Sequence, residues 1–333
     1  MSELKNYMLG DYRSILKYSE QINRYGLSKL PPLIISCAIT GAQHGAEANM
    51  NLPETAEDQA QSTYDAYNAG ASLVHVHARN PQNLAVDTSN SEDYKRVNHL
   101  IREKCPDIII NNTCIGGRLL DVDQGTISDK LHVSLPACPE VASIDIATTT
   151  NRIKMRGRKP PLTGGHSEDW VKHFDYVMTD DNAVEILNEM KQYGIKPEWE
   201  MYNITDIKQL NRLMATGIVE EPYWIQMLFG GNGVQPSAQS LMLAADLLPE
   251  KSLFSVIAIG GTAPSISALA IILGHHVRVG LEDAVYYAPH QKAESNAQLV
   301  ERVVKLARLL GREVATPAQA REMLGLGAPR AYD

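Results

Sequence analysis

The sequence has 333 residues, of which 44% are hydrophobic and 21% are charged, and its formal net charge at pH 7 is −8. This composition is that of a globular protein with a large core, and the length suits a single α/β barrel, which needs about 250 residues. The acidic balance and the absence of any run of lysine or arginine argue against a nucleic-acid or anionic-membrane partner, because such partners need a concentrated basic face.

The chain begins with a polar stretch, residues 1–30, that lacks the apolar core of a signal peptide. We interpret it as an N-terminal extension and residues 31–333 as one barrel domain. No apolar run reaches the roughly 20 residues that cross a bilayer, so no membrane partner is expected. The four cysteines form no Cys-x-x-Cys pair, which favours the reducing cytoplasm as the compartment.

Short apolar runs alternate along the rest of the chain with segments of helical periodicity. Continuous apolar runs indicate strands that are buried on both faces, as in parallel sheets. The predicted strands are Leu33–Ile39, Ser72–His77, Asp107–Asn112, Val141–Ile146, Pro197–Tyr202, Trp224–Leu228, Leu253–Ile259 and His276–Gly280. The clearest predicted helices are Thr55–Asn68, Ser91–Lys104, Asn182–Tyr193, Ser237–Leu248, Pro264–Leu273 and Asn296–Leu310.

Eight strands that alternate with helices predict a (β/α)8 TIM barrel of the α/β class. A doubly wound open sheet is the alternative, but Thr40–Gly45 after the first strand does not match the Gly-x-Gly-x-x-Gly fingerprint. Residues 151–180 are expected to form a long irregular insertion after the fourth strand, near the mouth of the barrel. Loops of that length are often functional.

His75 and His77 lie two residues apart at the carboxyl end of the second predicted strand, so both imidazoles point to the same side. In such barrels the carboxyl ends of the strands form the catalytic rim. Two imidazoles, a third ligand and one open position make a typical catalytic zinc site. The spacing also allows the alternative that one histidine packs in the barrel and the other makes a backbone hydrogen bond.

Charged residues occur at the ends of two other strands. Glu198 and Glu200 share one side of the fifth strand and could serve as metal ligand, base or substrate clamp, unless they are solvated acids at an exposed strand end. On the eighth strand Arg278 precedes Glu282 and Asp283, where one acid can reach a metal and the other a base or an arginine. A structural ion pair is the alternative there.

Small polar residues mark further strand ends. Thr40, Thr113 and Ser143 could each donate a hydrogen bond to a carboxylate or carbonyl, although serine and threonine are also common in turns and caps. Gly260 and Gly261 precede a predicted helix, whose free N–H groups and dipole favour a phosphate group. A plain turn explains these glycines equally well.

Together these segments resemble the β-keto acid cleavage enzyme family, from about Leu33 to the end of the chain. The resemblance implies an acyltransferase in which a β-keto acid attacks acetyl-CoA, and CoA transfer with retro-Claisen cleavage then gives acetoacetate and a new acyl-CoA. The motifs that carry it are Ile39-Thr40-Gly41-Ala42, Asn51-Leu52-Pro53, His75-Val76-His77-Ala78-Arg79, Pro139-Glu140, Pro197-Glu198-Trp199-Glu200, Arg278-Val279-Gly280-Leu281-Glu282-Asp283 and Glu294-Ser295-Asn296-Ala297-Gln298-Leu299-Val300.

The resemblance also implies a zinc ion (Zn2+) held by His75, His77 and Glu282, with the remaining coordination given to the β-keto acid. It further implies a homo-oligomer, often a tetramer. The other residues to which it gives a role are Arg278, Asp283 and Glu200 in catalysis, and Thr113 and Ser143 in binding the substrate carboxylate and ketone.

The sequence departs from the family resemblance after Thr-Gly-Ala, where a member that acts on an amino-bearing substrate has a glutamate to meet the ammonium group. This chain has Gln43 there, followed by His44. A neutral amide does not favour a cation, so we expect Gln43 to contact a substrate side chain that is neutral or anionic.

A second departure concerns the phosphates of acetyl-CoA. Family members often carry an arginine where this chain has Gly260-Gly261-Thr262. Backbone groups of Gly260 and Gly261 are therefore candidates to bind CoA. Further candidates lie in the long insertion, namely Arg156, Arg158 and Lys159.

Two other classes of function compete with this interpretation. A zinc amidohydrolase also uses a His-x-His pair in a barrel, but on the first strand and with further histidines from later strands. Here the pair is on the second strand, and His275 and His276 lie at the start of the eighth. A non-catalytic small-molecule binding protein would have to explain why so many charges converge on one rim, at a cost to stability.

Overall fold

The structure is a computed structural model that describes residues 24–114, 117–128 and 132–332. Most of the predicted N-terminal extension, up to residue 23, therefore lies outside the described residues. Among the described residues, no helix is long and apolar enough to cross a membrane.

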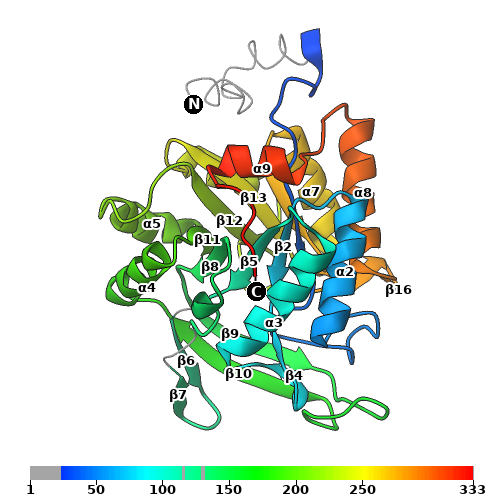
Figure 1. Ribbon diagram of the computed structural model, residues 1–333. Helices are drawn as coiled ribbons and strands as arrows, with labels where there is room; N and C mark the ends of the chain where they lie inside the picture. The colour runs from blue at the N-terminus through cyan, green and yellow to red at the C-terminus, as the bar shows by residue number, and fades with distance from the viewer. Residues whose placement is uncertain (1–23, 115–116, 129–131, 333) are drawn as a thin grey trace.

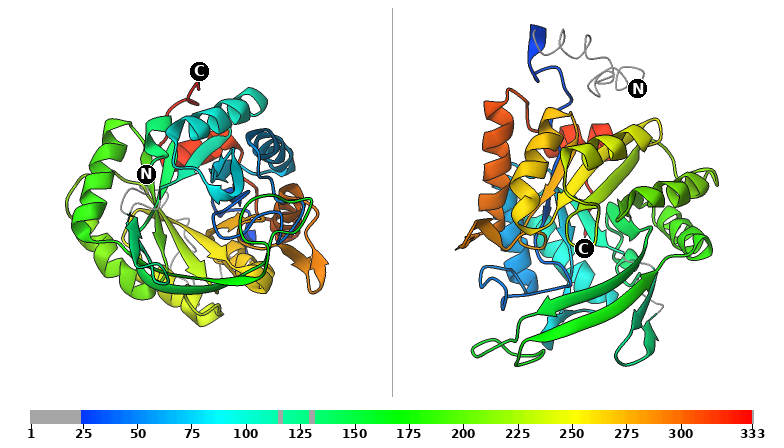
Figure 2. Two further views of the ribbon diagram at one scale, coloured as in Figure 1. Left: turned by 90° about the horizontal axis from the view of Figure 1, so that it is seen from below. Right: turned by 180° about the vertical axis from the view of Figure 1, so that it is seen from behind.

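Eight parallel strands close into a barrel, with helices around its outside (Figures 1 and 2). The predicted TIM barrel is thus confirmed, and the closed ring excludes a doubly wound open sheet. The order around the barrel is β1 (Ile35–Ala38), β14 (His276–Val279), β13 (Ser252–Ala258), β12 (Tyr223–Phe229), β11 (Lys196–Met201), β8 (Val141–Asp145), β5 (Ile109–Thr113) and β2 (Leu73–Val76).

The predicted helices are also confirmed, each to within a few residues. Polar side chains just before several of them accept a hydrogen bond from the first turn, as Thr55 does from the N–H of Asp58. In the part of the chain that the structure describes, the α-helices α5 (Ile207–Met214) and α9 (Pro317–Leu324) are not among the predictions. The predicted ones are α2 (Ala56–Ala69), α3 (Ser91–Lys104), α4 (Asp180–Gln192), α6 (Ala238–Leu247), α7 (Ala263–Ile272) and α8 (Asn296–Leu309).

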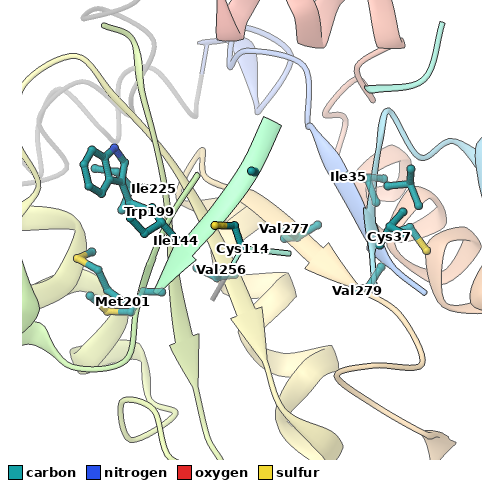
Figure 3. Close-up of a cluster of buried hydrophobic side chains, with 14 of the residues drawn as sticks. Ile35, Cys37, Cys114, Ile144, Trp199, Met201, Ile225, Val256, Val277 and Val279 are labelled. Carbon is teal, nitrogen blue, oxygen red and sulfur yellow. The ribbon is translucent and has the colours of Figure 1, made fainter. Parts of the chain in front are cut away.

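The barrel has two apolar layers. Outward-facing strand residues such as Ile144, Trp199 and Val256 belong to the large core between the strands and the helices (Figure 3). A smaller cluster inside the barrel includes Leu73 and Trp224 and is closed by residues of α9. This second cluster forms an apolar floor, which leaves the opposite end, at the carboxyl ends of the strands, for polar side chains.

A four-stranded antiparallel sheet lies across that end of the barrel (Figure 2), and we call it the mouth sheet. Its order is β7 (Thr126–Ser128), β6 (Arg118–Asp121), β10 (Trp170–Val177) and β9 (Thr148–Met155). Residues 151–180 lie in an insertion after the fourth barrel strand, as predicted, but the expectation that it is irregular is wrong, because β9 and β10 pair along their whole length. Alternation of polar with β-branched and aromatic residues explains these strands.

Candidate metal centre and active site

The three predicted metal ligands meet at the carboxyl end of the barrel. His75 lies in β2 and His77 directly after Val76, its last residue, with 5.1 Å between the ring centroids. Glu282 follows β14, and its Oε1 atom is 3.8 Å from Nε2 of His75 and 3.7 Å from Nε2 of His77. The other oxygen, Oε2, is buried and has no hydrogen-bond partner among the described residues. These three side chains are arranged so that they could hold a metal ion.

A carboxylate behind His77 fixes the orientation of its ring. Nδ1 of His77 lies 2.9 Å from Oδ2 of Asp87, the last residue of β4 (Asn83–Asp87). Metal-binding histidines are commonly oriented in this way. Burial lowers the pKa of His77, but the carboxylates of Asp87 and Glu282 outweigh it and raise the pKa above its usual value. Asp87 is not among the predicted site residues, since only the hairpin of β4 with β3 (Arg79–Asn80) returns it to β2.

Arg278 stands at the centre of the acidic residues beside this group. It donates from Nε and Nη2 to the two carboxylate oxygens of Asp283, each over 3.1 Å, and from Nη1 to Oε1 of Glu200 over 2.8 Å. Nη2 also donates to Glu282. Burial raises the pKa of Asp283 to about 7, although Arg278 lowers it. The predicted catalytic residues are therefore in contact with one another, as ion pairs inside the barrel.

The two glutamates of β11 have different surroundings. Both are buried, so the alternative of solvated acids at an exposed strand end is wrong. Glu200 lines the same cavity as Arg278. Glu198 accepts hydrogen bonds from Asn111 Nδ2 over 2.6 Å and from Gln226 Nε2 over 2.7 Å, and is not among the lining residues.

Asp145, at the end of β8, lines the cavity but is not among the predicted site residues. It is the strand partner of Glu200, and its Oδ2 atom accepts a hydrogen bond from the Tyr202 hydroxyl over 3.0 Å. Burial, and then the charge of Glu200, raise the pKa of Asp145 well above its usual value. A protonated Asp145 would offer the cavity a hydrogen-bond donor.

The cavity enclosed by these residues measures about 330 Å³. Gln43 and Thr113, two of the predicted substrate-binding residues, line it, as does Thr40. The third, Ser143, is buried beside Thr113 on the neighbouring strand and is not among the lining residues. The mouth sheet supplies the outer wall with Leu119, Thr149, Asn151, Ile153, Phe174 and Tyr176.

Two of the groups that were candidates to bind CoA phosphates already form other interactions within the protein. The N–H of Gly260 donates to the carbonyl oxygen of Asp283 over 2.8 Å. Arg158 is buried, and its Nη1 atom forms ion pairs with Glu47 at 2.5 Å and Glu54 at 2.7 Å. Neither group is therefore available to a phosphate. The candidates that remain exposed are Gly261, Arg156 and Lys159.

Comparison with known proteins identifies related sequences over nearly the whole chain. The sequence model of the beta-keto acid cleavage enzyme family matches residues 32–326. The 3-keto-5-aminohexanoate cleavage enzyme of Fusobacterium nucleatum is 34% identical over 300 residues, and that of Acetoanaerobium sticklandii is 35% identical over 295 residues. Each alignment covers 88% of this chain and 98% of the relative.

A more distant relative and one solved structure extend this comparison. The 3-dehydrocarnitine:acetyl-CoA trimethylamine transferase of Rhizobium meliloti is 29% identical over 318 residues, which cover 90% of this chain and 98% of the relative. The apo structure of ObcA superposes with a TM-score of 0.60 at 20% identity, over 83% of this chain and 66% of its own. The likeness to ObcA is one of fold.

Proposed function

This chain belongs to the beta-keto acid cleavage enzyme family, and we propose that it condenses a β-keto acid with acetyl-CoA to give acetoacetate and a new acyl-CoA. The observation that carries the proposal is the meeting of the His75, His77 and Glu282 group with Arg278 and Asp283 in one cavity. A relative whose name is that of an acetyl-CoA-dependent transferase also supports it.

We propose zinc as the metal of this site. Two imidazole nitrogens and one carboxylate oxygen are a donor set that zinc uses in catalytic sites with an open position. The unpartnered Oε2 of Glu282 and the hydrogen bond between His77 and Asp87 support this choice. A bound zinc ion would act as a Lewis acid toward the ketone and carboxylate oxygens of the keto acid and so lower the cost of enolate formation.

Asp283 is the base in the proposed reaction. Arg278 holds both of its carboxylate oxygens beside the proposed metal ligands His75, His77 and Glu282. It takes a proton from C2 of the keto acid, and C2 then attacks the thioester carbon of acetyl-CoA and expels the CoA thiolate. The thiolate attacks the C3 ketone carbon, the bond between C2 and C3 breaks, and Asp283 returns the proton to C2. Acetoacetate and the new acyl-CoA together contain every atom of the reactants.

Arg278 and Glu200 support this base. The positive charge of Arg278 stabilises the oxyanions that form at C3 and at the thioester carbon. Glu200 binds the opposite side of the guanidinium group, at 2.8 Å, and so fixes its orientation. Asp283→Asn is expected to lower kcat by at least about 100-fold, the usual contribution of a general base.

The test is to incubate the zinc-loaded protein with acetyl-CoA and a panel of β-keto acids and to detect acetoacetate and acyl-CoA by mass spectrometry. Asp181→Asn, a change of an exposed acid of α4 outside the cavity, is the control for Asp283→Asn. Hydrolysis of amides without acyl-CoA formation would favour an amidohydrolase instead.

We also propose that the protein is a homo-oligomer, as the family resemblance implies. The exposed side of α6 supports this, because Leu243 and Leu247 are 49% and 46% exposed. Light scattering of the purified protein tests the proposal, and a monomer over the micromolar range would contradict it.

A further inference from the structure

We propose that the β-keto acid carries a neutral, mainly apolar side chain, and that the inner face of the mouth sheet selects it. This inference rests on the proposed function, because it concerns the side chain of the same keto acid. It goes further than the substitution at Gln43, which excludes only a preference for a cation.

The charged side chains of the cavity gather at one end. In the described part of the cavity wall, the charged residue at the centre is Arg278. Glu200, Glu282 and Asp283 contact it directly, and Asp145 is the strand partner of Glu200. This end suits the carboxylate and ketone that all β-keto acids share. The residues concerned are Asp145, Glu200, Arg278, Glu282 and Asp283.

The opposite wall is the inner face of the mouth sheet. Strand register places Phe174 opposite Asn151, and Tyr176 between Thr149 and Leu119. Phe174 and Tyr176 are only 7% and 4% exposed, so they are packed into the wall. The Tyr176 hydroxyl donates to the carbonyl oxygen of Asp145 over 2.9 Å, and Tyr176 is one of the residues that line the cavity.

The polar groups of this wall are bonded to one another. Asn151 donates from Nδ2 to Oγ1 of Thr149 over 2.9 Å and accepts through Oδ1 from Asn232. Lys172 lies on the same face as Ile153, but its ammonium group is over the Phe174 ring, 5.2 Å from the centroid, and does not line the cavity. No charged side chain of the described wall is thus available to pair with a charged substrate group.

One uncharged acceptor is available. Oε1 of Gln43 is buried and has no hydrogen-bond partner among the described residues. It can accept a hydrogen bond from a hydroxyl group of the substrate, which remains neutral. A hydroxylated aliphatic chain therefore falls within the proposed class, and a carboxylate or ammonium group does not.

The physical consequence is a preference that can be measured. Each methylene group buried against Leu119, Ile153 and Phe174 should raise kcat/KM about fourfold. A charged group in the same place loses its hydration and gains no partner, so we expect kcat/KM to fall at least about tenfold.

The first experiment compares three keto acids with the same six-carbon chain: 3-oxohexanoate, the cationic 3-keto-5-aminohexanoate and the anionic 3-oxoadipate. The expected result is a kcat/KM for 3-oxohexanoate at least about tenfold above both others. Equal values, or a preference for either charged acid, overturn the inference. Affinities measured by calorimetry without acetyl-CoA separate the two proposals: selective binding of 3-oxohexanoate without acyl-CoA formation contradicts the proposed function alone.

The second experiment places a charge in the wall. Ile153→Arg should raise the ratio of kcat/KM for 3-oxoadipate to that for 3-oxohexanoate at least about tenfold. Ile153→Glu should raise the ratio of kcat/KM for 3-keto-5-aminohexanoate to that for 3-oxohexanoate by a similar factor, at least about tenfold. Val171→Glu is the matched control, because Val171 pairs with Lys154 and faces away from the cavity. Ratios that stay within twofold in the Ile153 variants contradict the inference. Thr149→Lys and Thr149→Glu, on the same face, repeat the test if the Ile153 variants do not fold.

Discussion

Nδ1 of His77 lies 2.9 Å from Oδ2 of Asp87, so a carboxylate from a short hairpin orients one of the proposed zinc ligands. Asp87→Asn keeps the shape of the side chain and removes its charge. We expect the affinity for zinc to fall about 10- to 100-fold, as measured by competition with a chromophoric chelator. Asp123→Asn, in the exposed turn between β6 and β7, is the control. An equal loss of zinc affinity in both variants would show that the hydrogen bond between His77 and Asp87 does not contribute to zinc binding.

Gly41 approaches Glu282 so closely that any side chain would displace the proposed ligand. Its φ angle is +73°, and a Cβ atom there would overlap the Glu282 side chain. Gly41→Ala should therefore lower both stability and zinc content. Gly217→Ala is the matched control, because Gly217 has φ +69° and open space around it. That variant should lose about 1 to 2 kcal/mol of stability and keep its zinc. Full zinc content in Gly41→Ala would argue against Glu282 as a ligand.

Arg158 connects the loop before β10 to the loop after β1. Its guanidinium group is buried and pairs with Glu47 and Glu54. Arg158→Met leaves two buried carboxylates without their ion-pair partner, and we expect the free energy of unfolding in urea to fall by about 3 to 5 kcal/mol. The exposed pair of Arg96 with Glu57 offers the comparison, since Arg96→Met should cost less than about 1 kcal/mol. Similar losses of unfolding free energy in Arg158→Met and Arg96→Met would contradict the prediction that the buried ion pairs matter more than the exposed one.

His275 should make the protein sensitive to acid. Burial, and then the charge of Arg312, lower the pKa of His275 from 6.5 to about 3. Below pH 6.5 the unfolded chain takes up this proton and the folded protein does not, so falling pH favours unfolding. At pH 5.5 we expect the free energy of unfolding to be lower by about 1.4 kcal/mol than at neutral pH because of this residue.

The measurement is urea unfolding at pH 7.5 and pH 5.5 for the wild type, His275→Leu and the control His290→Asn, whose imidazole is exposed. His275→Leu should lose less stability on acidification than the other two proteins. If all three lose the same amount, the buried imidazole does not contribute to acid sensitivity.

The barrel could be predicted from the sequence because its strands are buried on both faces. Most of them therefore appear as largely apolar runs, such as Leu253–Ile259, which overlaps β13. The ligand pair could also be predicted, since a period of two along a strand fixes the common side of His75 and His77. Their third partner, Glu282, came from the family resemblance and not from spacing.

The rest of the site depends on contacts that no local pattern encodes. Closure of the β3–β4 hairpin brings Asp87 to His77, and the register between β8 and β11 brings Asp145 to Glu200. The strands within residues 151–180 could not be predicted, because strands that alternate within a long polar insertion give a weaker signal than apolar runs. Buried ion pairs such as that of Arg158 are likewise visible only in the folded chain.

The most direct test of the proposed reaction follows the carbons of acetyl-CoA. The zinc-loaded protein is incubated with 3-oxohexanoate and acetyl-CoA that carries 13C at both acetyl carbons, and the products are analysed by mass spectrometry. The proposed reaction places both labelled carbons in the acetyl half of acetoacetate and none in the acyl group of the new acyl-CoA. Unlabelled acetoacetate, or label in that acyl group, would contradict it.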